Sequence, residues 1–324
     1  MDLSVVIPIR NEEASLPELV RELIDVLGRW GRSFELLLID DGSTDTSFEI
    51  LARLQTAEPR LRVIRFRRNF GQTAAFAAGF DHARGRYIVT MDGDLQNDPA
   101  EIPAMIVELE RGSDIVCGWR KRRQDPFVSR RLPSMMANWL ISRVTGVHLH
   151  DYGCSLKVFR AEIVKPMKLY GEMHRFLPAI ASEQTSSITE VPVNHRARKY
   201  GRSKYGIGRT VRVVLDLLTV KFLLTYSTRP LQLFGLIGGT MTLLGALISG
   251  WLAVERLREV ISLNAHYPLL LLGVVLIMTG VQLMTLGLLA EIQARTYHES
   301  QNKPTYVIRE IRETQPVERV FSSR

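Results

Sequence analysis

The stretch RYIVTMDGDLQNDP, residues 86–99, joins an apolar run to an acidic turn and then to a proline. Residues 86–91 have the composition of a buried strand, and Pro99 opens the next predicted helix. Asp92 and Asp94 stand one residue apart where that strand ends, and carboxylates held so close repel each other unless a cation lies between them. The pair therefore predicts a Mg²⁺ or Mn²⁺ site that also holds a diphosphate; an ordinary acidic turn is the alternative.

Short apolar runs alternate with helical patterns along residues 1–120. Strands are predicted for the runs LSVVIPI, FELLLID, LRVIRF, RYIVTM and SDIVCG. Helices are predicted between them, near Ser15–Arg29, Thr44–Ala57, Gly71–Ala83 and Pro99–Arg111. This order predicts an α/β fold, with a mostly parallel sheet covered by helices on both faces.

Polar clusters lie at the carboxyl ends of three predicted strands, at residues 8–12, 40–43 and 92–94. Ligands of such sheets bind beyond those strand ends, so the clusters mark the expected site. The first two are also ordinary helix-entry and turn sequences, and that interpretation stays open for them.

Two apolar stretches without a charged residue, Leu231–Val254 and Pro268–Ala290, follow the α/β region. Each exceeds the about 20 residues that cross a bilayer, whereas a buried helical hairpin is the alternative. Basic residues concentrate before the first stretch and after the second, while charges in the loop 255–267 balance. The positive-inside rule thus places both termini and the large domain in the cytoplasm.

The N-terminus agrees with a cytoplasmic large domain. Met1 and Asp2 lead straight into a strand pattern, so no cleavable leader is expected. Cys117 and Cys154 are expected to remain thiols in a reducing cytosol and to serve packing. The net charge of +8 does not indicate nucleic acid, because the basic residues cluster near membrane-proximal segments and no nucleic-acid motif accompanies them.

Six motifs together resemble one family: VVIPIRNEE, LLLIDDGSTD, RRNFGQTAAFAAGF, MDGDLQNDP, DYGCSLKVFR and RKYGRSKY. With the two spans that follow, they are similar to family 2 glycosyltransferases of GT-A fold, specifically polyprenyl-phosphate glycosyltransferases such as dolichol-phosphate mannose synthase and bacterial undecaprenyl-phosphate glucosyltransferases. The resemblance implies a Rossmann-like sheet, amphipathic interface helices and two C-terminal transmembrane helices. The expected parts are a cytoplasmic catalytic domain (1–205), an interface helix (206–229), two transmembrane helices with a short external loop (230–292) and a cytoplasmic tail (293–324).

The resemblance also implies roles for individual residues. Those expected to bind the nucleotide sugar are Pro8, Arg10, Asn11, Glu12, Asp41, Asp92, Gln96, Arg202, Ser203 and Lys204. Asp92 and Asp94 are the expected metal ligands, and Asp151 matches the family's proposed base. A lipid monophosphate is already largely dianionic at neutral pH, so we expect Asp151 to place the acceptor or a neighbouring cation rather than to remove a proton. A structural Asp at a helix start is the alternative.

Basic and amphipathic segments are candidates for reaching a lipid acceptor. Arginine binds phosphate through two donors, and the candidates for the acceptor phosphate are Arg120, Arg122, Arg123, Arg130 and Arg131. Residues 129–146 and 207–228 have apolar side chains at helical spacing, which favours helices lying in the membrane interface. A merely solvated basic run is the alternative for these arginines, and packing against the soluble core is the alternative for both helices. For the basic loop residues such as Arg202 and Lys204, the alternative is attraction to anionic lipid headgroups.

The expected reaction is the inverting transfer of one hexose, from UDP-glucose, to undecaprenyl phosphate at the inner face of a bacterial plasma membrane. GDP-mannose, UDP-N-acetylglucosamine, an aminoarabinose donor and a dolichyl acceptor are alternatives. A processive polysaccharide synthase would show a QxxRW motif, which the chain lacks. A third alternative is a membrane-anchored binding protein with an inactive transferase domain. The resemblance implies a homo-oligomer, and the run PTYVIREI (304–311) predicts a tail strand that pairs with its own sheet or with a neighbouring subunit.

Overall fold

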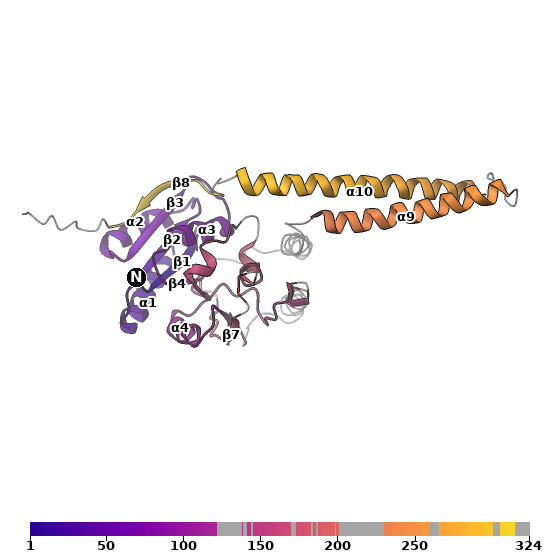
Figure 1. Ribbon diagram of the computed structural model, residues 1–324. Coiled ribbons are helices and arrows are strands. Elements are labelled where there is room, and N and C mark those ends of the chain that lie inside the picture. The colour runs from indigo at the N-terminus through magenta and orange to yellow at the C-terminus, as the bar shows by residue number, and fades with distance from the viewer. Residues whose placement is uncertain are drawn as a thin grey trace, which may run out of the picture. The chain divides into compact units, whose positions relative to one another are not determined.

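The computed structural model divides the chain into two compact units, residues 1–220 with 304–324, and residues 221–303. The residues that it describes are 1–121, 138, 141–143, 145–169, 173–182, 184–185, 187–197, 199–200, 230–258, 266–300 and 305–314. Each unit is considered by itself below (Figure 1).

The described strands of the first unit form one sheet of eight, in the order β7-β5-β6-β4-β1-β2-β3-β8. Their bounds are β1 Leu3–Ile9, β2 Phe34–Asp40, β3 Leu61–Phe66, β4 Tyr87–Thr90, β5 Ile115–Trp119, β6 Lys157–Arg160, β7 Ile188–Pro192 and β8 Ile308–Arg312. Strands β1 to β4 pair in parallel, whereas β6 and β8 are antiparallel to their neighbours. The mostly parallel α/β sheet expected from the sequence is therefore confirmed.

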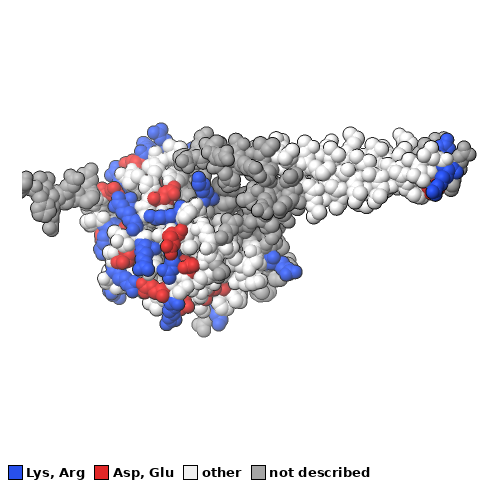
Figure 2. Space-filling view, in the orientation of Figure 1, with Lys and Arg blue, Asp and Glu red and all other residues white. Residues whose placement is uncertain are grey.

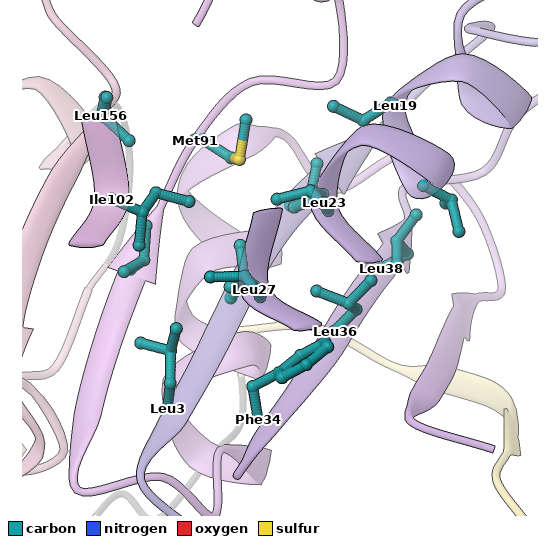
Figure 3. Close-up of a cluster of buried hydrophobic side chains, with 14 of the residues drawn as sticks. Leu3, Leu19, Leu23, Leu27, Phe34, Leu36, Leu38, Met91, Ile102 and Leu156 are labelled. Carbon is teal, nitrogen blue, oxygen red and sulfur yellow. The ribbon is translucent and has the colours of Figure 1, made fainter. Parts of the chain in front are cut away.

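Helices cover both faces of the sheet, because successive side chains of each strand point to opposite faces. The main helices are α1 Leu16–Trp30, α2 Ser47–Ala57, α3 Gln72–His82 and α4 Ile102–Glu110, with the 3₁₀ turn η1 Pro99–Glu101 before α4. In β1, Leu3, Val5 and Ile7 point into a core formed with α1, α2 and α4 (Figure 3). The opposite face packs against α3, where a Cβ added at Gly79 would strike Val6. Small side chains thus let α3 lie close to the sheet.

The expected helix bounds are nearly those observed, and the largest difference has a clear cause. α2 begins at Ser47 rather than at Thr44. The backbone N–H of Thr44 donates to Asn11 Oδ1, and the Thr46 hydroxyl donates to Glu13. These bonds hold residues 44–46 as a turn against the loop after β1, so the helix starts one turn later.

The tail strand β8 closes the free edge of β3. Its backbone pairs antiparallel with residues 63–66 (Figure 1). Tyr306 stacks on Phe66 with ring centroids 5.2 Å apart and donates its hydroxyl to Asp81. Of the two pairings that the sequence left open, the structure has the one within the chain's own sheet.

The second unit contains two long apolar helices, α9 Pro230–Leu257 and α10 Tyr267–Ser300. Residues Phe234–Leu257 and Tyr267–Leu289 are long and apolar enough to cross a membrane. Their visible surface carries almost no charge except at one end (Figure 2). Arg256 lies in the last turn of α9, and Arg258 follows it directly. The two helices contact each other through glycine, since a Cβ at Gly245 or Gly280 would strike the backbone of the facing helix. Close backbone approach at small residues is typical of helix pairs in membranes.

Candidate active site

The first part of the site is the pair of loops that follow β1 and β2. Asn11 has a left-handed φ of 53°, and its side chain and backbone bond to Ser43 and Thr44. Glu12 donates its backbone N–H to Ser47 at 2.9 Å. Among the residues predicted beside them, Pro8 is half-buried and Arg10 is exposed. The described geometry therefore ties both loops into one polar surface at the carboxyl edge of the sheet.

Asp41 lies beneath this surface, with 3% of its area exposed. Its carboxylate accepts hydrogen bonds from the backbone of Phe70 at 2.6 Å and Gly71 at 3.0 Å, and so holds the start of α3. Burial raises the pKa of Asp41, although those backbone bonds oppose the change. Gly42 has a φ of 66°, and a Cβ there would lie 2.6 Å from the backbone of Asn69, so only glycine fits this turn.

Asp92 stands at the end of β4 with both carboxylate oxygens hydrogen-bonded. Gln72 donates to Oδ1 at 2.8 Å, and Ser155 donates to Oδ2 at 2.7 Å. Asn97 Oδ1 accepts from the Asp92 backbone at 3.0 Å and from the Ser155 hydroxyl at 2.9 Å. This network fixes the orientation of a carboxylate at the centre of the predicted donor site.

Asp94 is buried, with 8% of its area exposed, and its Oδ1 accepts the backbone N–H of Gln96 at 3.1 Å. Asp98, the third acidic residue of the turn, has a different role. It caps η1 through the backbone of Ala100 and forms an ion pair with Arg196 at 2.8 Å. Asp98 therefore serves the structure of the turn, and Asp92 and Asp94 stay the predicted metal ligands.

The aspartate pair fits a hard divalent ion that shares its coordination shell with a substrate. A carboxylate has about four lone-pair sites, so the two hydrogen bonds to the Asp92 side chain leave oxygen lone pairs for a cation, and Asp94 adds a second carboxylate to the same turn. Within the described part of the chain, no group of three or more His, Cys, Asp or Glu side chains is arranged to hold a metal. Mg²⁺ commonly takes one or two carboxylates and completes its shell with phosphates and water, which matches this donor set.

Asp151 and Arg120 form a bidentate ion pair, with Arg120 Nε 2.7 Å from Asp151 Oδ2 and Nη2 2.9 Å from Oδ1. Their side chains are 3% and 14% exposed, respectively. Burial disfavours the charge on Arg120, but the bonds to Asp151 outweigh it and hold the pKa of Arg120 above its ordinary value. The predicted base and a predicted phosphate-binding residue are therefore direct partners.

Glu190 on β7 sets the position of this ion pair. Its Oε1 accepts the backbone N–H of Asp151 at 2.9 Å, and its Oε2 accepts that of His150. The His150 ring stacks on Trp119 with centroids 4.4 Å apart. Loop 151–156 supplies both Asp151 and Ser155, so it links the ion pair to Asp92.

Four partners of Asp92 and Asp151 were not assigned from the sequence: Gln72, Asn97, Ser155 and Glu190. The first three lie inside quoted motifs, which was the available signal, but Glu190 lies in an ordinary strand pattern. Seven predicted site residues are outside the described residues: Arg122, Arg123, Arg130, Arg131, Arg202, Ser203 and Lys204. Most of both predicted interface helices is outside them as well.

The sheet with an acidic pair at its carboxyl edge defines the GT-A class of α/β fold. Mannosyl-3-phosphoglycerate synthase from Rubrobacter xylanophilus superposes with a TM-score of 0.56 at 14% identity, covering 68% of this chain and 74% of that one. Glucosyl-3-phosphoglycerate synthase from Mycobacterium tuberculosis, solved with Mn²⁺, UDP and phosphoglyceric acid, gives 0.55 at 20% identity, covering 68% and 78%. At these identities the likeness shows the fold alone.

Sequence comparisons identify the family. The model of glycosyl transferase family 2 matches residues 4–167. Dodecaprenyl-phosphate galacturonate synthase of Rhizobium johnstonii is 49% identical over 96% of this chain and 93% of its own length. Undecaprenyl-phosphate 4-deoxy-4-formamido-L-arabinose transferase of Pseudomonas aeruginosa is 39% identical over 95% and 90%. The chain therefore belongs to glycosyltransferase family 2, as its motifs indicated.

Proposed function

We propose that the enzyme transfers one sugar from a nucleoside-diphosphate donor to the phosphate of a polyprenyl lipid, with inversion at the anomeric carbon. The observation that carries this proposal is the placement of the aspartate pair and of the Arg120–Asp151 pair around loop 151–156. One side offers oxygen ligands for a metal–diphosphate, and the other offers a guanidinium for a phosphate. Full-length similarity to two polyprenyl-phosphate sugar transferases supports it.

Asp92 and Asp94 would hold the divalent ion, Mg²⁺ or Mn²⁺, against the donor diphosphate. The ion supplies charge neutralisation for the leaving nucleoside diphosphate. Gln72 and Ser155 keep the Asp92 carboxylate in a fixed orientation through bonds of 2.8 and 2.7 Å. Ser15 joins the segment after β1 to the loop after β4, because its hydroxyl donates to the Gly93 carbonyl at 2.8 Å. The donor half of the site is thereby rigid before substrate binds.

Arg120 would bind the acceptor phosphate, and Asp151 would position it. A carboxylate that already accepts two charge-assisted bonds from a guanidinium is a weak proton acceptor, whereas the dianionic lipid phosphate needs no base. The remaining Arg120 donors are then free to contact phosphate oxygen. This role keeps the acceptor-placing function that the sequence favoured for Asp151.

For the sugar, we propose galacturonate from UDP-galacturonate. The 49% identical relative is named for galacturonate, and the 39% identical one for 4-deoxy-4-formamido-L-arabinose. These names favour a charged or modified sugar over the UDP-glucose expected from the sequence, and they favour bacterial polyprenyl acceptors. We further propose that both termini face the cytoplasm of the plasma membrane, where the basic flanks of α9 and α10 lie by the positive-inside rule, and that the enzyme is a homo-oligomer.

A donor screen tests the proposal. Purified full-length enzyme with Mn²⁺ is incubated with undecaprenyl phosphate and one radiolabelled donor at a time: UDP-galacturonate, the UDP-linked formamidoarabinose, UDP-glucose, UDP-N-acetylglucosamine or GDP-mannose. We expect the lipid to be labelled fastest from UDP-galacturonate and to carry a single sugar. Label in a long polymer, or no labelled lipid from any donor, would contradict it.

A further inference from the structure

A short segment after β7 holds the loop that carries the aspartate pair. The backbone N–H of Arg196 donates to the Gln96 carbonyl at 2.9 Å. His195 forms an isolated antiparallel bridge with Asn97. Residues 92–98, hereafter the aspartate loop, are therefore contacted by residues 194–196 at Gln96 and Asn97.

The Arg196 side chain adds two ion pairs to these backbone contacts. Its Nη2 lies 2.8 Å from Asp98 Oδ1, and its Nη1 lies 2.7 Å from Glu22 Oε2 on α1. The other Asp98 oxygen accepts Asn194 Nδ2 at 3.0 Å. We name this group of Arg196, Asp98, Glu22 and Asn194 the Arg196 clamp. It fastens the aspartate loop to a helix of the core.

The aspartate loop needs such support, because its backbone is strained. Leu95 has a φ of 62°, in the left-handed region that leucine rarely adopts. Strained conformations of this kind persist where the surroundings over-determine them, and they cluster at functional sites. Leu95 itself is buried in the core with 4% of its area exposed, which fixes the loop from below while the Arg196 clamp fixes it from outside.

The position of the aspartate loop sets the position of both metal-binding candidates. Gln96 donates its N–H to Asp94 Oδ1, and Asn97 accepts the N–H of Asp92. Residues 96 and 97 are also the two that segment 194–196 contacts through the backbone. A displacement of this segment would therefore move both carboxylates together.

We propose that Arg196 is a positioning residue for the donor, which acts through Asp98 and Glu22 to hold Asp92 and Asp94 at the spacing that binds a metal–diphosphate. The inference rests on the proposed function. In this proposal Asp98 holds the loop in place, whereas Asp92 and Asp94 bind the metal. Arg196 itself need not touch the substrate.

The test measures how strongly Mn²⁺ increases the affinity for UDP. The dissociation constant of UDP is determined by calorimetry on full-length enzyme in detergent, once with Mn²⁺ and once with EDTA. We expect Arg196→Ala to reduce the Mn²⁺-dependent gain in affinity about tenfold, equivalent to about 1.4 kcal/mol, with UDP affinity in EDTA unchanged. Arg196→Lys, which keeps one cation, is expected to retain the gain within about threefold.

Lys199→Ala is the matched control. Lys199 pairs with Glu18 at 2.7 Å, so this variant removes an ion pair between a residue shortly after segment 194–196 and the same helix, α1, without touching Asp98. It is expected to keep the wild-type gain. Because 36% of the Arg196 side chain is exposed, its replacement leaves the core intact. Glu22→Gln serves as a milder second variant, since it removes one ion pair of Arg196 and leaves the pair with Asp98.

The outcomes separate the inference from the proposed function. If wild-type enzyme binds UDP more tightly with Mn²⁺ and Arg196→Ala does so equally, the positioning role is overturned while the function stands. Equal losses of affinity with Mn²⁺ and with EDTA, together with a lower Tm, would mean a merely structural role. If Mn²⁺ gives wild-type enzyme no gain, the proposed donor site fails and the Arg196 clamp with it.

Discussion

At the scale of single residues, our proposal for the acceptor rests on the Arg120–Asp151 pair. Both side chains are largely buried, and the two contacts of 2.7 and 2.9 Å give the guanidinium a fixed plane. Such a pair places phosphate well but offers little basicity. The Glu190 carboxylate accepts the backbone N–H of Asp151, so the geometry is set by three residues from distant parts of the chain.

Asp151→Asn tests the positioning role. We expect the transfer rate to fall about 100-fold, because an unpaired Arg120 loses its orientation, and the loss to persist at every pH from about 6 to 9. The measurement is a pH profile of the initial rate with saturating donor. A loss that disappears well above the second pKa of the lipid phosphate would instead identify Asp151 as a general base.

The sequence predicted roles for some of these residues, but it did not predict which of them would form pairs. Asp92, Asp94, Arg120 and Asp151 were expected at the site because charged residues at strand ends, or in quoted motifs, carry a recognisable signal. Their pairing depends on contacts between residues tens of positions apart, which no local pattern encodes. Glu190 shows the limit most clearly: it lies in β7, where an alternating strand pattern conceals its bonds to residues 150 and 151.

At the scale of elements, the outer strands β2, β3 and β8 are joined by a buried arginine. Arg62 is 6% exposed and lies 2.8 Å from Glu35 on β2 and 2.7 Å from Glu313 beyond β8. Glu35 also accepts the backbone N–H of Arg84 at 2.7 Å. The tail thus completes an ionic network as well as the sheet edge.

Two matched variants distinguish the buried ion pair of this network, Arg62–Glu35, from the more exposed one, Arg62–Glu313. Glu35→Gln is expected to lower the free energy of unfolding by about 3 kcal/mol, because it leaves a buried guanidinium without its buried partner. Glu313→Gln, at a carboxylate that is 31% exposed, is expected to cost less than about 1 kcal/mol. Urea unfolding of the two variants gives the comparison, and equal losses would refute the distinction.

The helix pair α9 and α10 offers a second test at this scale. A Cβ at Gly280 would lie 2.8 Å from the Thr242 backbone nitrogen and would strike the Gly238 carbonyl, whereas nothing lies within 4 Å of a Cβ at Gly250. We expect Gly280→Ala to destabilise the hairpin by about 1–3 kcal/mol through overpacking, and Gly250→Ala to be neutral. Thermal unfolding in detergent measures both variants. An unchanged Tm for Gly280→Ala would argue against the close contact of α9 and α10 at this glycine.

Periodicity explains which elements were predictable. The β1–α1 to α4–β5 series was expected because apolar runs alternate there with helical patterns. β6 was not, since its place between β4 and β5 depends on long-range pairing. The tail strand was expected from its alternation, but the sequence left open whether it pairs with its own sheet or with a neighbouring subunit; the structure places it beside β3.

At the scale of the whole molecule, the proposed topology places the charged loop between α9 and α10 outside the membrane and both termini inside. Cys117 and Cys154 are buried, so a cysteine introduced in the loop or in the tail would be the thiol that reacts with a reagent. We expect Ser262→Cys to react with a membrane-impermeant maleimide on intact spheroplasts, and Ser322→Cys to react only after permeabilisation. The reverse pattern would invert the topology and remove the catalytic domain from its cytosolic donor.

The most direct measurement is the initial rate at which radiolabelled galacturonate passes from UDP-galacturonate to undecaprenyl phosphate, in Mn²⁺ and after chelation. Wild-type enzyme is compared with Asp92→Asn/Asp94→Asn, which keeps the size of both side chains. We expect chelation and the double substitution each to reduce the rate at least about 100-fold, since both remove charge neutralisation from the leaving diphosphate. Transfer at the wild-type rate by the double variant would contradict the central claim.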